Sequence, residues 1–201
     1  LVVWKNTASG LFEYVYGDLR QARRLMRRLM TRHAQTMEGK LPLVTDSIDV
    51  YNFLMSAPQL FAGFPMLEKK AENFIRQIRF VADFLPSENA SSIAGKVQFM
   101  PTALFSLDTL SEQKIKQKLH TLFGKNFVQC GYKEGIIPPL GYGFVKHTRA
   151  SAYALQAVRT VATHQAQTVF VPSGLAALGV GFYLRKFYPT AQVRHIIELN
   201  G

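Results

Sequence analysis

The stretch Thr168-Val-Phe-Val-Pro-Ser-Gly-Leu-Ala-Ala-Leu-Gly-Val-Gly-Phe-Tyr-Leu-Arg-Lys-Phe-Tyr-Pro189 does most to predict how this chain folds. Val169 to Val171 is typical of a buried strand, Ser173-Gly174 of a tight turn, and the residues that follow of an apolar helix. A strand that leads through a glycine turn into a helix is the usual anion site of an open α/β sheet. The start of such a helix offers free N–H groups and a partial positive charge.

The residues after this turn do not suit a phosphate group. Leu175, Ala176, Ala177 and Leu178 stand where a phosphate cradle needs glycines and a hydroxyl, so that the backbone can approach the ligand. We therefore interpret Ser173 and Gly174 as a vestigial phosphate loop, in a scaffold that has lost the site itself.

The rest of the chain alternates between strand-like and helix-like segments. We expect strands at 1–4, 41–45, 96–100, 126–129, 135–137, 169–171 and 193–199, and helices at 18–35, 68–85, 111–123, 150–163 and 175–187. Asp46 and Asp49 are expected to lie in a loop between two of these segments, where their side chains cap the backbone of the loop. The alternation predicts an α/β fold with an open, mostly parallel sheet and helices on both faces. The length fits a single α/β domain over residues 1–201, with a smaller lobe around 41–100 as the alternative arrangement.

The charge of the chain is strongly positive. It has 24 Lys and Arg against 13 Asp and Glu, which gives a formal net charge of +11. An RNA partner, an anionic membrane surface and residence in a compartment of basic proteins, such as the mitochondrial matrix, would each explain this balance. Charged residues make up only 18% of the chain and hydrophobic residues 48%, which favours a protein-rich interface over an RNA coat.

A basic amphipathic helix is expected from Asp18, a suitable N-cap, to about Gln35. Its apolar residues and its arginines each recur at a spacing of three to four, so they occupy different faces. No aromatic residue interrupts the basic face, so the face indicates recognition of charge, without DNA specificity. The candidate partners are rRNA, anionic lipid such as cardiolipin and an acidic protein, and the alternative is a solvated face. The arginines are Arg20, Arg23, Arg24, Arg27, Arg28 and Arg32.

Other chemistry-bearing residues are sparse. Cys130 is the only cysteine, so no disulfide framework is expected, and we interpret it as a buried structural thiol. The five histidines are scattered and none has metal-ligand spacing, so no metal site is expected. No uninterrupted apolar run is long enough for a transmembrane helix. The chain begins with Leu1 rather than Met, as expected of a processed form or an incomplete sequence.

In the order of its motifs the chain resembles the fold-type II pyridoxal-phosphate (PLP) enzymes, the tryptophan synthase β-like group. The similarity is greatest to the branch of D-cysteine desulfhydrase and aminocyclopropane-carboxylate deaminase. It lies in Ile136-Ile-Pro-Pro-Leu-Gly141, the alanine-rich helix after it, Val169-Phe-Val-Pro-Ser-Gly174, and Pro189 before a final strand. Val3-Trp-Lys5, Thr7-Ala-Ser-Gly10 and the run from Gly17 to Leu25 follow the order of the family's N-terminal motifs. The resemblance implies the family's α/β fold, in a truncated form.

The departures from the family argue against its chemistry. The Schiff-base lysine should follow Gly17, where this chain has Asp18, Leu19 and Arg20. An arginine cannot form the imine, because its guanidinium stays protonated. The phosphate loop lacks its glycines, and the substrate loop keeps Ser47 and Asn52 without the histidine. We therefore expect a degenerate member of the family that has no cofactor and no catalytic residues.

The expected function is that of a pseudoenzyme, an accessory or structural subunit of a large mitochondrial assembly. A respiratory-chain complex, the ATP synthase and the mitochondrial ribosome are all compatible, with a location in the matrix or on the matrix side of the inner membrane. One alternative is a working PLP-dependent lyase or deaminase acting on a small amino acid, with Lys5 or Lys40 as its lysine. The other is an RNA-binding ribosomal protein.

Overall fold

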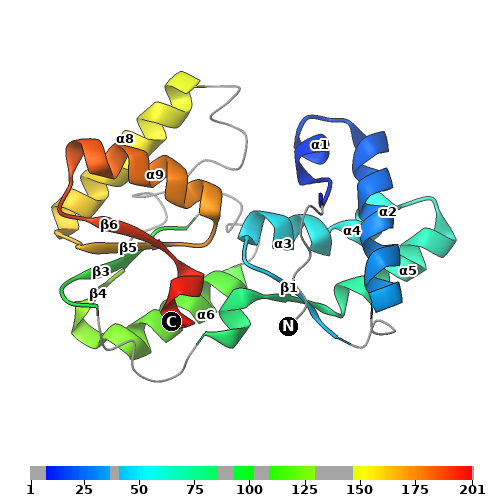
Figure 1. Ribbon diagram of the computed structural model, residues 1–201, viewed down its shortest axis with the longest axis horizontal. Helices are drawn as coiled ribbons and strands as arrows, with labels where there is room; N and C mark the ends of the chain where they lie inside the picture. Colours follow the sequence, from blue (N-terminus) through cyan, green and yellow to red (C-terminus); the bar gives the residue numbers. More distant parts are fainter. Residues whose placement is uncertain (1–7, 37–40, 86–92, 102–108, 130–146, 201) are drawn as a thin grey trace. The chain divides into compact units, whose positions relative to one another are not determined.

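The computed structural model describes residues 8–36, 41–85, 93–101, 109–129 and 147–200 (Figure 1). The chain divides into two compact units: Leu1–Thr45 with Asp49–Phe80, and Asp46–Ile48 with Val81–Gly201. We call these the N-terminal and C-terminal units. The division falls near residues 45 and 80, whereas the smaller lobe considered from the sequence spans about 41–100. The strands predicted at 1–4 and 135–137 lie outside the described residues, as do Lys5, Lys40 and Cys130.

The N-terminal unit consists mainly of helices. In chain order it contains α1 (Leu11–Val15), α2 (Leu19–Gln35), β1 (Leu43–Thr45), all but the first residue of α3 (Ile48–Met55), α4 (Ala57–Leu60), α5 (Pro65–Ile75) and β2 (Ile78–Phe80). The two strands are parallel, with Leu43 opposite Ile78 and Thr45 opposite Phe80. α3 begins two residues earlier than the apolar pattern predicts, so Asp49 is buried in its first turn rather than placed in a loop.

The predicted basic helix is confirmed as α2. Its N-cap is Asp18, whose side chain accepts a hydrogen bond from the backbone N–H of Gln21 at 3.0 Å. One face is buried in the N-terminal unit, through Ala22, Met26, Leu29, Met30 and His33. Gly10, with a φ of 94°, lies against this helix, and a Cβ there would come within 2.9 Å of the carbonyl oxygen of Ala22. Glycine is therefore needed at position 10 both for its backbone angle and for the close approach.

The helix predicted at 68–85 is wrong in its second half. α5 ends at Ile75, and Ile78–Phe80 forms β2, followed by a 3-10 turn at Val81–Phe84. The apolar residues continue at helical spacing as far as Ala82, but Ile78 and Phe80 also alternate with exposed Arg79 as a strand requires. The pairing with β1, more than thirty residues away in the sequence, decides between the two patterns.

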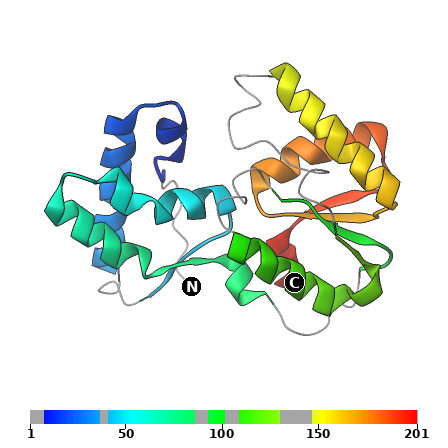
Figure 2. The same cartoon turned by 180° about the vertical axis from the view of Figure 1, so that it is seen from behind.

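The C-terminal unit is built on a four-stranded sheet in the order β4-β3-β5-β6, with every pair parallel. Its elements are β3 (Val97–Phe99), α6 (Thr109–Phe123), β4 (Phe127–Val128), α8 (His147–His164), β5 (Thr168–Val171), α9 (Gly174–Phe187) and β6 (Gln192–His195). α8 and α9 lie on one face of the sheet and α6 on the other (Figures 1 and 2). The predicted α/β fold, with a parallel sheet between helices, is confirmed.

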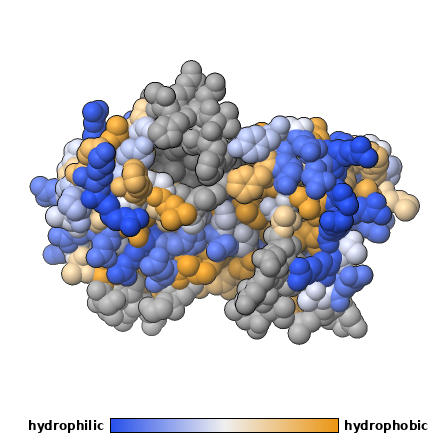
Figure 3. Space-filling model, turned by 45° about the horizontal axis from the view of Figure 1, so that its top comes forward, coloured by the Kyte–Doolittle hydropathy of each residue, from blue (hydrophilic) through white to orange (hydrophobic). Residues whose placement is uncertain are grey.

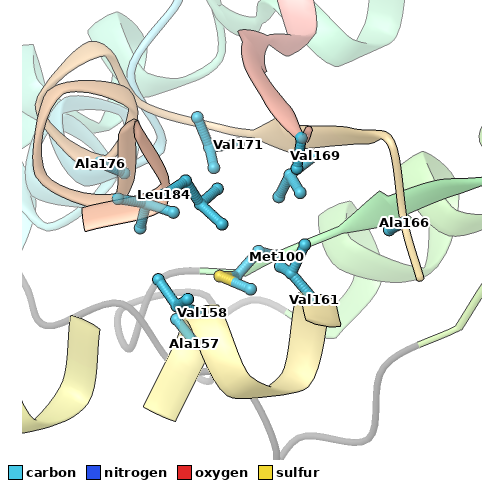
Figure 4. Close-up of a cluster of buried hydrophobic side chains, with 11 residues drawn as sticks. Met100, Ala157, Val158, Val161, Ala166, Val169, Val171, Ala176 and Leu184 are labelled. Atoms are coloured by element: carbon cyan, nitrogen blue, oxygen red, sulfur yellow. The ribbon is translucent and has the colours of Figure 1, made fainter. Parts of the chain in front are cut away.

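A hydrophobic cluster of this unit lies between the sheet and the two helices α8 and α9. Val169 and Val171 of β5 point toward Val158 and Val161 of α8, and toward Leu184 of α9 (Figure 4). On the opposite face of β5, Phe170 stacks on Phe123 of α6 with 6.1 Å between ring centroids. Each fully buried side chain of this size contributes roughly 1.5–3 kcal/mol to the stability of the fold. Because side chains alternate along β5, this one strand packs against the helices on both faces of the sheet.

The last predicted strand, at 193–199, is too long. β6 ends at His195, and Ile196–Asn200 forms a 3-10 turn. Two local hydrogen bonds bend the chain there: the backbone N–H of His195 donates to Glu198 Oε1 at 2.7 Å, and that of Ile197 donates to His195 Nδ1 at 3.2 Å. Side chains that bond to nearby backbone groups compete with a continuing strand.

Within the described ranges, no helix has the length and hydrophobicity needed to span a bilayer.

Candidate functional site

The C-terminal sheet has a topological switch point between β3 and β5. From β3 the chain passes through α6 to β4 on one side, whereas β5 and β6 lie on the other side of β3. In open α/β sheets, ligands usually bind outside the carboxyl ends of the strands at such a point. Here that place is bordered by Met100 after β3 and by Ser173 after β5, the residue singled out from the sequence.

Ser173 has a structural role in the turn between β5 and α9. It is 1% exposed, and its hydroxyl accepts a hydrogen bond from the backbone N–H of Ala176 at 3.4 Å, as the N-cap of α9. Gly174 follows with open space where a Cβ would project. The predicted strand, turn and helix are therefore present, and the hydroxyl that could meet a ligand is used to begin the helix.

The segment Asp46–Ile48 lies beside the carboxyl end of β5. The backbone N–H of Ile48 donates a hydrogen bond to the carbonyl of Pro172 at 3.1 Å, and Ile48 is fully buried. Asp46 lies near His195 at the end of β6, because the carboxylate and the backbone of Asp46 both favour the protonated form of the His195 imidazole. The protein's own chain is thus packed next to the Ser173–Gly174 turn.

His195 is the ionisable group of this region that burial affects most clearly. Desolvation lowers the pKa of His195 below its ordinary value of 6.5, and the carboxylates of Asp46 and Glu198 act in the opposite direction. Its Nδ1 accepts from Ile197, and its Nε2 is buried without a hydrogen-bond partner among the described residues. Sequence reasoning did not single out this histidine, because its proximity to Asp46 is a tertiary contact.

The side chains of Ser173, Asp46 and His195 do not form a nucleophile paired with a general base. In the described structure the Ser173 hydroxyl bonds to Ala176, and the His195 ring bonds to the backbone of Ile197. Nucleophilic catalysis requires the nucleophile and the base to share a hydrogen bond. Within the same residues, no group of three His, Cys, Asp or Glu side chains could hold a metal ion.

The position that matches the Schiff-base lysine of the PLP enzymes does not fit that cofactor either. Gly17 has a φ of 85°, and the next residue, Asp18, uses its carboxylate to cap α2. A carboxylate in this place would repel a phosphate group and cannot form an imine. We derive no chemistry through pyridoxal phosphate from these residues.

The second candidate region is the basic face of α2, which we call the arginine face and define by Arg20, Arg24, Arg27, Arg28 and Arg32. All five residues are exposed, and the last four line a shallow groove with Thr31 and Gln35. At 100° per residue, these positions lie on the side of α2 opposite its buried residues. Figure 3 shows hydrophilic side chains gathered over the unit that contains α2.

Arg23 differs from the other arginines predicted on this helix. It is half-buried, its Nε donates to the carbonyl of Leu60 at 2.8 Å, and its guanidinium lies 5.6 Å from the centre of the Phe64 ring. Arg23 therefore joins α2 to the start of the α4–α5 connection. The six arginines predicted from spacing fall into one internal residue and five exposed ones.

The arginine face carries unneutralised charge in the described structure. Neither an ion pair nor a side-chain hydrogen bond joins the guanidinium groups of Arg20, Arg24, Arg27 and Arg28 to any described residue. Beside its N-terminal end, α1 and the start of α2 expose large apolar side chains that sequence reasoning missed. These are Phe12, Val15, Tyr16 and Leu19.

No family model matches the sequence, and no curated protein is significantly similar to it. The resemblance to the PLP enzymes therefore rests on the order of the motifs in this chain.

Proposed function

We propose that this protein is a non-catalytic pseudoenzyme that serves as an accessory or structural subunit of a large mitochondrial assembly. It docks through the arginine face of α2 to a protein neighbour that presents carboxylates. The observation that carries the proposal is this row of exposed arginines, of which at least Arg20, Arg24, Arg27 and Arg28 lack a carboxylate partner among the described residues.

The composition of the surface favours a protein partner over RNA. Arginine and aromatic residues are enriched at protein interfaces, where lysine is depleted, and the exposed face of α2 has arginines and no lysine. Guanidinium groups also match carboxylates in a two-point geometry that lysine cannot offer. The exposed Phe12, Tyr16 and Leu19 would supply the apolar part of the same interface.

Two observations support a role without catalysis. The Ser173 hydroxyl and the Asp18 carboxylate, at the two positions where the resembled enzymes hold their cofactor, are engaged in helix capping. The Ser173 and His195 side chains bond elsewhere instead of to each other. The arrangement suits a scaffold better than an active centre.

The test is native purification of the endogenous protein from mitochondria, followed by sizing and mass spectrometry of the material that travels with it. The proposal predicts a large particle that survives both nuclease and mild detergent. Release by nuclease would identify an RNA partner, and release by detergent a lipid surface, and either result would overturn the protein docking proposed here. A small, free, yellow species would identify a PLP enzyme instead.

A further inference from the structure

A polar pocket lies at the amino-terminal side of β5 and β6, at the opposite end of β5 from Ser173. It has a volume of about 580 Å³, and most of the residues that line it carry amide, hydroxyl or guanidinium groups. Its polar side chains come from the turn before β5, the connection between α9 and β6, and β6 itself. They include Gln165, Gln167, Tyr188, Thr190, Gln192 and Arg194.

β6 is an edge strand of the sheet, and among the described helices α9 packs against one of its faces. Val193 points toward α9, where it lies 3.9 Å from the position of a Cβ on Gly181. Gln192 and Arg194 point to the opposite face, because side chains alternate along a strand. On that face α6 packs against β3 and β4 (Figure 2). The same face of β6, which carries Gln192 and Arg194, borders the pocket.

Arg194 is the one charged side chain among the residues that line the pocket. It is half-buried, and neither an ion pair nor a hydrogen bond joins its guanidinium to any residue that the structure describes. A partly desolvated guanidinium is stabilised by an oxyanion, which it binds through two parallel hydrogen bonds. No carboxylate of the lining residues supplies one.

The neutral groups around Arg194 suit a ligand rich in hydroxyls. The amides of Gln165, Gln167 and Gln192 can each donate and accept hydrogen bonds, as can the hydroxyl of Thr190. The backbone beneath them is fixed, because the N–H of Gln192 donates to the carbonyl of Gln167 at 2.8 Å. The pocket therefore presents one cation and several neutral polar groups on a rigid strand pair.

We propose that this pocket binds a small hydroxylated oxyanion, with Arg194 as the residue that holds the phosphate or carboxylate group. The glutamine amides and Thr190 then contact the hydroxyls of the ligand. This site is independent of the arginine face and of the docking proposed for it.

The experiment is a titration of the full chain with glucose 6-phosphate, gluconate and glucose, followed by NMR or calorimetry. Saturable binding of either anion, with no comparable binding of glucose, is the expected result, and comparison of the two anions identifies the preferred head group. R194Q should weaken the binding roughly tenfold or more, as for a lost charged hydrogen bond. R159Q removes an exposed arginine of α8 that lies outside the pocket, and it should bind like the wild type.

A second variant guards against misfolding of R194Q. Q192E places a carboxylate beside Arg194 on the same face of β6, so it should occupy the guanidinium and abolish binding while the thermal stability is retained. Equal affinity of R194Q and the wild type, equal binding of glucose, or no saturation with either anion would each overturn the proposal.

Discussion

The Nε atom of Arg23 donates a hydrogen bond to the backbone carbonyl of Leu60, across 2.8 Å, and the same guanidinium lies over the ring of Phe64. The next residue on the helix, Arg24, is exposed and lines the groove of the arginine face. Two adjacent arginines of one helix therefore have different roles. Arg23 packs within the N-terminal unit, whereas Arg24 presents its charge at the surface.

This difference predicts unequal effects of the same substitution. Arg23→Ala should lower the free energy of unfolding by about 1–2 kcal/mol, since it removes a charged hydrogen bond and a cation–π contact. Arg24→Ala should change it by less than about 0.5 kcal/mol, as is usual for an exposed side chain. Urea denaturation followed by helical circular dichroism measures both. Equal losses would show that Arg23 is not an internal support.

The core between the sheet and α9 predicts a second matched pair. Leu184 is 1% exposed and belongs to the cluster with Val169 and Val171, whereas Leu178 of the same helix is 66% exposed. Leu184→Ala should cost about 2–5 kcal/mol through lost burial and the cavity that remains. Leu178→Ala should cost less than about 0.5 kcal/mol. A similar cost for the two would contradict the placement of α9 on the sheet.

Gln165 is a position where a substitution should stabilise the protein. It has a φ of 55°, and it ends α8 in a motif where its N–H donates to Ala162 and that of Ala166 donates to Val161. Glycine adopts this left-handed conformation without the cost that a side chain brings, so Gln165→Gly should raise the stability by about 1 kcal/mol. Gln156→Gly, inside the same helix, should lower it by about 1 kcal/mol. Thermal melts of the two variants should therefore shift in opposite directions.

We predict that His195 makes the stability of the protein depend on pH. Because burial lowers its pKa in the folded state, the unfolded chain binds more protons as the pH falls below 6.5. The contribution of this residue is therefore present above pH 6.5 and is lost as the pH falls toward its lowered folded value. His195→Asn keeps an acceptor for the N–H of Ile197 but does not titrate in this range.

The measurement is the difference in unfolding free energy between the wild type and His195→Asn at several pH values from about 5 to 7.5, around the unperturbed histidine pKa. The wild type should lose stability relative to the variant on acidification. A constant difference would mean that His195 is not desolvated in the folded protein.

Local sequence patterns were sufficient where one face of an element is buried and its ends are capped. The helix from Asp18 to Gln35 and the strand, turn and helix around Ser173 follow from spacing and capping residues alone. Local patterns failed at Ile78–Phe80, where a strand forms because β1 lies beside it. They also failed at Ile196, where hydrogen bonds to the side chains of Glu198 and His195 bend the chain. In both cases the deciding bonds are absent from the pattern of apolar residues.

The candidate sites show the same limit. Spacing placed the arginines on one side of α2, but the internal role of Arg23 depends on Leu60, which lies 37 residues further along the chain. The polar pocket had no signal in the sequence, because Gln167, Tyr188 and Arg194 are ordinary residues until the parallel pairing of β5 and β6 brings their segments together.

The most direct test of the central claim compares two triple variants of the full chain in their native cells. R24Q/R27Q/R28Q removes three charges from the arginine face, and K69Q/K70Q/R76Q removes three exposed charges from α5 and its C-cap in the same unit. The fraction of each protein that sediments with the large mitochondrial particle is measured on a density gradient. We predict that the first variant is lost from the particle while the second remains with it like the wild type. Equal sedimentation of the two variants, or a wild type that sediments as a small free protein, would contradict the account.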